Sequence, residues 1–333
     1  MNSYLYPKIL IDFWLKRPSE KEELESPKKK ADWLSFYSFL KKETNLFLNL
    51  DLSTHDHTDE RNPLNKIIPL LVSGRDKTSF SADPSHFSPL ESANPIINIK
   101  KQQALICFDN SISNIQEKKG HNGYFIWSLN DYYKMWQKIR DFENKSSNGI
   151  TVGENGVVKS WSDLKFLRHP CNTIIISDRY LLCDKQRGLN TLIGIFSNLF
   201  FIFKQRPKVL IISPIDKVFE KNIDRLFNII SQALLEAGFY VDFNLLIAYS
   251  NTMKHDRKII SNYFHFDSGD SWDYFEPNGK FKTKGTKINV IPIFNNPNNE
   301  ALQQSLEEIK IVMKNRNSEK RGDNFNETLL ELE

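Results

Sequence analysis

The chain has 333 residues, of which 40% are hydrophobic and 12% aromatic. This length is about twice that of a typical domain, and the apolar content is sufficient for a sizeable core, which excludes a disordered chain and a small disulfide-stabilised scaffold. The formal net charge is only +4, so charge alone permits a polyanionic partner without requiring one.

Residues 1–150 are expected to form an α/β domain of unassigned type. Apolar residues recur at helical spacing in residues 30–43, whereas leucines alternate strictly between Leu46 and Leu52, as in a strand. Residues 73–95 are rich in serine and proline and predict a long surface loop. The expected elements are, in chain order, helix 30–43, strand 46–52, helix 62–71, strand 104–108, strand 124–127 and helix 129–142.

Residues 143–160 concentrate glycine, asparagine and serine and predict a domain boundary, with the second domain at residues 160–315. In that domain, short apolar runs alternate with helical patterns, which is typical of a parallel α/β sheet. Residues 316–333 are expected to form a polar tail. The expected elements are strand 173–177, helix 189–203, strand 208–213, helix 217–237, strand 240–249, strand 258–266 and helix 299–313.

The most informative segment is KHDRKIISNYFHFDSGDSWDYF, residues 254–275. His255 and Arg257 are two residues apart, so on an extended strand they face the same side. Asn262 and Gly269 follow, and the spacing His-x-Arg-x4-Asn-x6-Gly resembles the phospholipase D signature, His-x-Lys-x4-Asp-x6-Gly-Ser. With its upstream strand–helix–strand order, the segment looks most similar to the C-terminal, phospholipase D-like domain of microtubule-interacting-and-transport proteins. The resemblance covers about residues 165–315.

The resemblance implies a phosphodiester-binding α/β domain. In an enzyme of this kind His255 would attack phosphorus, and Arg257, in place of the usual lysine, would bind the non-bridging oxygens. Asn262 is the third candidate catalytic residue and is expected near His255 and Arg257 in one shared pocket. It replaces the usual aspartate, and Asp270 stands where a phosphate-binding serine is expected, so the motif is degenerate. No other histidine is followed by a basic residue two positions later, so a complete two-motif site would require a homodimer.

Lysines follow the motif after a Pro-Asn-Gly turn. Alternation along a hairpin would place Lys280, Lys282 and Lys284 on one face. There they would contact a phosphate backbone or an anionic lipid surface, or they would only block edge-to-edge aggregation of the hairpin. Together with Gly269 and Ser271 they form the candidate substrate-binding set.

These patterns favour a phosphodiester-recognising protein, with nucleic acid as the expected ligand. The resemblance implies a nuclease or sensor in a bacterial defence or mobile-element system. One alternative is a non-catalytic adaptor that binds a partner protein or an anionic membrane. Another is a metal-dependent hydrolase, because His55, His57 and Asp59 form a His-x-His-x-Asp pattern similar to the zinc motif of metallo-β-lactamase-fold hydrolases.

For that loop, the competing interpretation is a solvated segment that caps the following helix. The favoured interpretation therefore includes no metal and no cofactor. The sequence has no run of 18 apolar residues, and its first residues do not match a secretory signal. A cytoplasmic protein without a transmembrane segment is expected.

Overall fold

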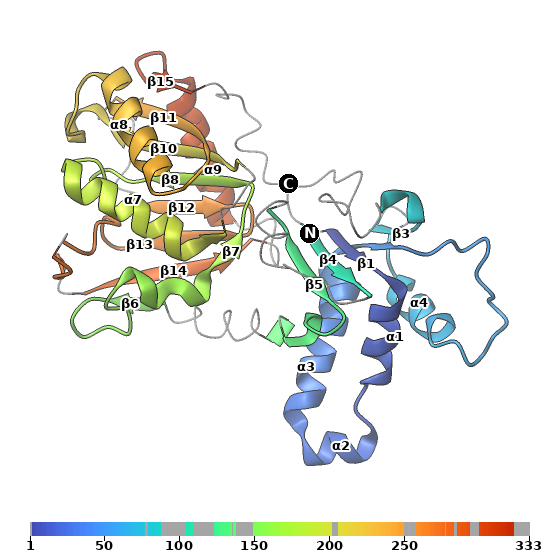
Figure 1. The fold of residues 1–333 in the computed structure, drawn as a ribbon. Helices are drawn as coiled ribbons and strands as arrows, with labels where there is room; N and C mark the ends of the chain where they lie inside the picture. The colour runs from blue at the N-terminus through green and yellow to red at the C-terminus, as the bar shows by residue number, and fades with distance from the viewer. Residues whose placement is uncertain are drawn as a thin grey trace. The chain divides into compact units, whose positions relative to one another are not determined.

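The computed structural model describes residues 2–76, 79–87, 104–109, 123–134, 136–137, 149–201, 206–249, 253, 257–276, 278–282, 285–293 and 300–322. The chain divides into two compact units. Unit 1 comprises residues 1–118 and 124–140, and unit 2 comprises residues 119–123 and 141–333. Each unit combines helices with a β-sheet, as expected for the α/β class (Figure 1).

Unit 1 contains a five-stranded sheet in the order β3-β2-β1-β4-β5, and all of its strand pairs are parallel. β1 is fully buried at the centre. The chain builds the sheet outward from β1 in one direction and then returns to add β4 on the other side, which creates a topological switch point. The strands are β1 (Asn2–Leu5), β2 (Asn45–Leu48), β3 (Phe80–Ala82), β4 (Ala104–Phe108) and β5 (Phe125–Ser128).

Aromatic side chains pack the helices of unit 1 together. The Phe13 ring stacks on the Trp33 ring with centroids 4.7 Å apart, and the indole nitrogen of Trp33 donates to the Phe13 carbonyl. The described helices are α1 (Pro7–Leu15), α2 (Glu20–Glu25), α3 (Pro27–Ser38), a π-helical turn η1 (Phe39–Glu43), α4 (Leu64–Val72) and a 3-10 turn η3 (Pro84–His86).

Three expectations for unit 1 need correction. The strand expected at residues 46–52 ends at Leu48, because Asp51 accepts hydrogen bonds from the backbone and hydroxyl of Ser53 and turns the chain. β1 was not expected, and β3 lies inside the serine- and proline-rich segment 73–95. Of the helix expected at 129–142, residues 132–134 and 136–137 are described and are helical.

Unit 2 contains an eight-stranded sheet in the order β15-β11-β10-β8-β12-β13-β14-β6. β8, β10 and β11 are parallel to one another, whereas the pairings on either side are antiparallel, so the sheet is mixed instead of parallel. The strands are β6 (Ile150–Val152), β8 (Thr173–Ser177), β10 (Lys208–Pro214), β11 (Asp242–Ala248), β12 (Lys258–Ser261), β13 (Phe264–Ser268), β14 (Thr286–Pro292) and β15 (Glu319–Arg321). The short strands β7 (His169–Pro170) and β9 (Phe200–Phe201) form a separate pair.

Several parts of unit 2 differ from the expectation. The helix expected at 189–203 ends at Leu199, before β9, and the helix expected at 217–237 begins at Ile223. The single strand expected at 258–266 is a hairpin of β12 and β13, because the Ser261 hydroxyl accepts from the backbone of Tyr263 and Phe264 and forms a tight turn. The expected tail contains β15, which pairs with β11 and whose Arg321 forms an ion pair with Asp224 of α8. Residues 323–333 lie outside the described part of the chain.

Helices cover both faces of the unit 2 sheet, with α7 and α8 on one face and α9 on the other (Figure 1). Strand residues on the α9 face, such as Ile175, Leu210 and Leu246, share a buried cluster with Leu306 and Ile309 of α9. Burying each such side chain contributes on the order of 1.5–3 kcal/mol. The described helices are η4 (Trp161–Leu167), α7 (Lys185–Leu199), η5 (Ile215–Lys217), α8 (Ile223–Glu236) and α9 (Glu300–Lys314).

This topology brings several chain segments to one edge of the sheet. The carboxyl ends of β8, β10 and β11 lie together because these strands are parallel. β12 runs antiparallel to β8 with Lys258 opposite Ser177, so β12 begins at the same edge. In open α/β sheets this edge is the usual place for ligand binding.

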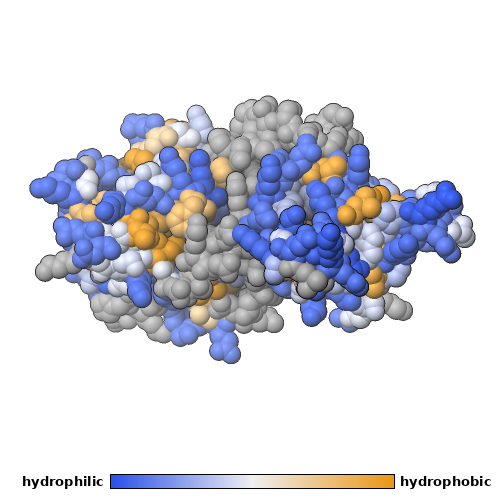
Figure 2. Space-filling view, turned by 90° about the horizontal axis from the view of Figure 1, so that it is seen from below, coloured by the Kyte–Doolittle hydropathy of each residue, from blue (hydrophilic) through white to orange (hydrophobic). Residues whose placement is uncertain are grey.

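None of the described helices combines the length and the apolar character needed to cross a bilayer. On the face shown in Figure 2, hydrophilic residues predominate among the coloured atoms, and hydrophobic residues form small separate groups.

Candidate functional site

A pocket of about 500 Å³ lies at the edge of the unit 2 sheet where β12 begins. Three chain segments contribute to it: the loop after β8, the residue before β12, and the connection between β13 and β14. The lining residues are Tyr180, Arg257, Asp270, Ser271, Asp273, Tyr274 and Lys282.

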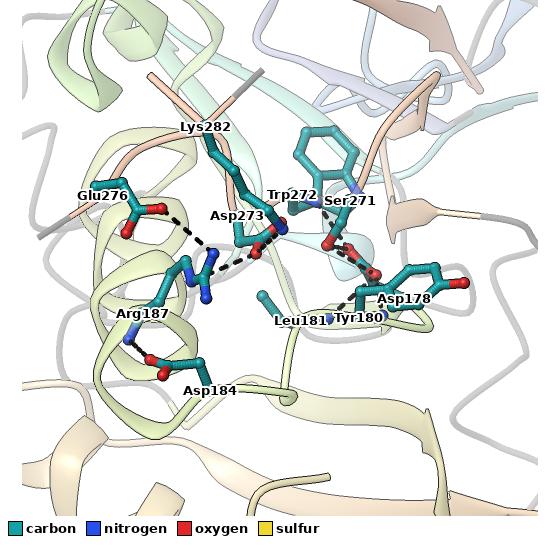
Figure 3. Close-up of polar contacts among 10 residues, drawn as sticks. All are labelled: Asp178, Tyr180, Leu181, Asp184, Arg187, Ser271, Trp272, Asp273, Glu276 and Lys282. Carbon is teal, nitrogen blue, oxygen red and sulfur yellow. Dashed lines mark hydrogen bonds and ion pairs between the residues drawn. The ribbon is translucent and has the colours of Figure 1, made fainter. Parts of the chain in front are cut away.

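A buried carboxylate joins two of these segments. Asp178 is fully buried at the end of β8 and accepts hydrogen bonds from the backbone N–H groups of Tyr180 (2.7 Å) and Leu181 (3.2 Å). It also accepts from the Ser271 hydroxyl (2.8 Å) and the Trp272 N–H (2.7 Å), as Figure 3 shows. Burial raises the pKa of Asp178, while these donors act in the opposite direction. The carboxylate therefore holds the Tyr180 loop and the Ser271–Trp272 segment together.

Arg257 lies at the start of β12 with its guanidinium in the pocket. One terminal nitrogen donates to the Gly269 carbonyl at 2.8 Å, and the guanidinium carbon lies 5.8 Å from the centre of the Tyr180 ring. The Nε atom is buried and has no hydrogen-bond partner within the part of the chain that the structure describes. The guanidinium is thus held in place at the pocket by one hydrogen bond, and a guanidinium has further N–H donors with which it can bind a ligand oxygen.

The second cation in the pocket is balanced by an internal carboxylate. The Nζ atom of Lys282 lies 2.5 Å from an Asp273 oxygen, and Nε of Arg187 lies 3.7 Å from the same oxygen. Arg187 also reaches Glu276 at 3.3 Å (Figure 3). Two cations therefore compensate the charge of Asp273, and its repulsion toward an incoming anion is reduced.

The structure brings together part of the predicted set. Arg257, Ser271 and Lys282 line the pocket, and Gly269 adjoins it through its carbonyl. Asp270, which departs from the phospholipase D signature, also lines the pocket.

The expectation that Asn262 lies beside Arg257 is wrong. Asn262 is fully buried in the β12–β13 turn, where its side-chain oxygen accepts from the backbone N–H of Asn172 at 2.9 Å. The whole of β12 separates it from Arg257, and a strand advances about 3.3 Å per residue. Asn262 therefore stabilises the opposite edge of the sheet and does not contact the pocket.

The other predicted residues lie away from the pocket or cannot be placed. Lys280 is exposed on a turn, where its N–H donates to Asn278, and it does not line the pocket. His255 and Lys284 lie outside the described residues.

Sequence reasoning missed Asp178 and Tyr180. Both follow directly after the buried strand β8, and polar residues at the carboxyl end of such a strand are a recognisable sign of a site.

His55 and His57, in the loop before α4, form hydrogen bonds with nearby residues. Nε2 of His55 lies 2.7 Å from the Asn65 side-chain oxygen, and Nε2 of His57 lies 3.2 Å from the Leu52 carbonyl. Asp59 accepts from the backbone N–H of Arg61. Among the described residues, no group of three or more His, Cys, Asp or Glu side chains is arranged to hold a metal ion. The loop is therefore a hydrogen-bonded surface segment, but the cap expected from it is absent, because Asn62 and not Asp59 accepts from the Leu64 N–H at the start of the helix.

No protein-family model matches the sequence, and a comparison with curated proteins finds no similar sequence.

Proposed function

We propose that unit 2 is a phospholipase D-like domain that binds a phosphodiester polyanion, a nucleic acid, in the pocket around Arg257. The observation that carries this proposal is the Arg257 guanidinium, which lines the pocket and is held beside Gly269 and Tyr180, with a single hydrogen bond, to Gly269, among the described residues. A guanidinium offers several donors in a planar fork and keeps its charge at every physiological pH, so phosphate oxygens suit it well.

The position of the pocket also supports the proposal. It lies at the carboxyl edge of parallel strands, and the motif residue Arg257 begins the strand that runs back along β8. The strand–helix–strand order of β8, α7 and β10 is the order on which the resemblance to phospholipase D-like domains rests.

The pocket also contains groups that oppose anion binding. Asp273 is compensated by Lys282 and Arg187, but Asp270 adds a negative charge to the lining. We therefore expect binding of moderate strength that depends strongly on salt, because each neutralised phosphate releases counterions.

Fluorescence anisotropy with labelled single-stranded DNA, double-stranded DNA and RNA over 50–200 mM salt tests the proposal. Arg257→Ala should weaken binding by about 10-fold or more, since a hydrogen bond to a charged group contributes about 1.5–3 kcal/mol. Arg257→Lys should retain part of the affinity. Arg225→Ala on the exposed surface of α8 is the matched control and should behave as wild type. Equal affinities for Arg257→Ala and Arg225→Ala, or binding that does not respond to salt, would contradict the proposal.

Turnover at this site is a separate part of the proposal. If His255 attacks phosphorus, His255→Ala should abolish hydrolysis of a labelled oligonucleotide while leaving its binding nearly unchanged. A composite site would pair two copies of the chain. Light scattering should then show a dimer in the active preparation, whereas an active monomer would exclude that arrangement.

A further inference from the structure

A further cation, Lys217, lies near Tyr180, which lines the pocket. Lys217 belongs to η5, the turn that follows β10, and its Nζ atom lies 5.8 Å from the centre of the Tyr180 ring. The guanidinium carbon of Arg257 lies at the same distance from that ring. Lys217 from η5 and Arg257, the residue before β12, thus lie near the same tyrosine. The faces of an aromatic ring attract positive charge.

Lys217 is available to a ligand. Its side chain is 37% exposed, and its ion pair with the adjacent Asp216 is long, at 3.8 Å. Such a surface pair contributes little. Lys217 and the pocket residue Lys282 both act on Cys183. Burial raises the pKa of the Cys183 thiol, and the positive charges of the two lysines oppose this increase. Both lysines therefore lie close enough to Cys183 for their charges to act on it.

The separation of the two cations limits what they can bind. Because each lies 5.8 Å from the ring centre, Arg257 and Lys217 are at most twice that distance apart. One strand of a duplex carries a phosphate every ~3.4 Å along the axis. Neighbouring phosphates are farther apart through space than along the axis, because the backbone also winds around it, so the two cations can reach neighbouring phosphates of one strand.

We infer that Arg257 and Lys217 bind two different phosphates of the same nucleic-acid strand, with Tyr180 between them. This inference rests on the proposed function and adds that the ligand needs at least two phosphates in a chain. Both cations lie near the Tyr180 ring in the free protein, and the second phosphate adds its own Coulomb attraction at Lys217.

Isothermal titration with 5′-phosphorylated thymidylates of one, two and three nucleotides, at low salt, tests the inference. In the wild-type protein, affinity should increase about 10-fold or more from one phosphate to three, which corresponds to one added charge-assisted contact. Lys217→Ala should remove this increase and leave the affinity for the mononucleotide within about twofold. Arg257→Ala should weaken binding of all three ligands.

Lys221→Ala is the matched control. Lys221 lies on the same loop, and its Nζ atom donates to the Ile215 carbonyl at 2.6 Å, so the variant removes the same charge without removing a contact to Tyr180. It should retain the wild-type increase with phosphate number. Circular dichroism checks that both variants are folded.

Four outcomes overturn the inference. Affinity that does not increase with phosphate number, or equal losses in Lys217→Ala and Lys221→Ala, would refute it, while Arg257-dependent binding of the mononucleotide would preserve the proposed function. Inorganic pyrophosphate is the further test ligand. If it binds as tightly as the trinucleotide and this binding depends on Lys217, the two cations bind a diphosphate group and not two phosphates of a strand. If none of these ligands binds, the proposed function fails as well.

Discussion

Replacing Asp178 by asparagine tests whether one carboxylate holds the pocket together. The change keeps the size of the side chain but turns one acceptor oxygen into an NH₂ donor. In the wild-type structure one oxygen accepts from Tyr180 and Leu181, and the other accepts from Trp272 and Ser271. The serine hydroxyl is also within 3.0 Å of the first oxygen and can turn toward it, but the Trp272 N–H would face the new donor.

The expected cost follows from these contacts. A lost hydrogen bond to a charged group costs about 1.5–3 kcal/mol, and a buried unsatisfied donor costs about 1–3 kcal/mol. Removing a buried charge recovers part of this, because burial raises the pKa of Asp178 and so penalises its ionised form. We therefore expect Asp178→Asn to lower the free energy of unfolding of unit 2 by about 3 kcal/mol.

Urea denaturation measures the change in the free energy of unfolding. Hydrogen exchange of the native protein, detected by mass spectrometry, shows which segments are affected. Peptides that contain the amides of Tyr180, Leu181 and Trp272 should exchange faster in the variant. Asp216→Asn is the control, because this exposed aspartate undergoes the same chemical change and should alter stability by less than about 0.5 kcal/mol. A loss below about 1 kcal/mol with unchanged exchange would refute the role assigned to Asp178.

Three further predictions concern charge and burial. Asp270→Asn should increase nucleic-acid affinity about threefold, since removing a unit charge about 6 Å from a phosphate in water relieves about 0.7 kcal/mol; unchanged affinity in the anisotropy assay would place Asp270 outside the ligand's field. Burial lowers the pKa of His169 and of His265 to about 4. The unfolded chain therefore binds protons that the folded chain does not, so each histidine should remove about 3 kcal/mol of stability as the pH falls from 6.5 to 4. Urea midpoints over this range test this, and a constant midpoint would contradict it. Asn262→Ala should destabilise unit 2 by about 1–3 kcal/mol, because it removes the acceptor of the part-buried Asn172 N–H, but it should not change the affinity of the remaining folded protein.

Several elements of unit 2 could be predicted because their signals are local. Thr173–Ser177 is a short run of apolar residues, and the expected strand and β8 have the same bounds. α8 was expected at 217–237 and spans Ile223–Glu236; it begins late because residues 215–217 form η5 and Asn222 caps the helix by accepting from the Arg225 N–H. Element type was thus predictable, whereas element ends depended on caps and turns.

The candidate site was predictable only in part. Motif spacing indicated Arg257 and Ser271, which line the pocket, and also Asn262, which does not. Spacing along a chain specifies which side of a strand a residue faces, but it does not show where the strand ends and turns. The turn after Ser261 carried Asn262 to the opposite edge of the sheet.

The sequence by itself determined the α/β class and the position of the basic motif, because apolar periodicity and residue spacing are properties of neighbouring residues. Only the tertiary structure decided that Asp178 meets Ser271, which is 93 residues away, and that Lys217 and Arg257 converge on Tyr180. These contacts depend on the order of the strands in the sheet. That order is set by packing and pairing across the whole unit, and a local pattern does not contain it.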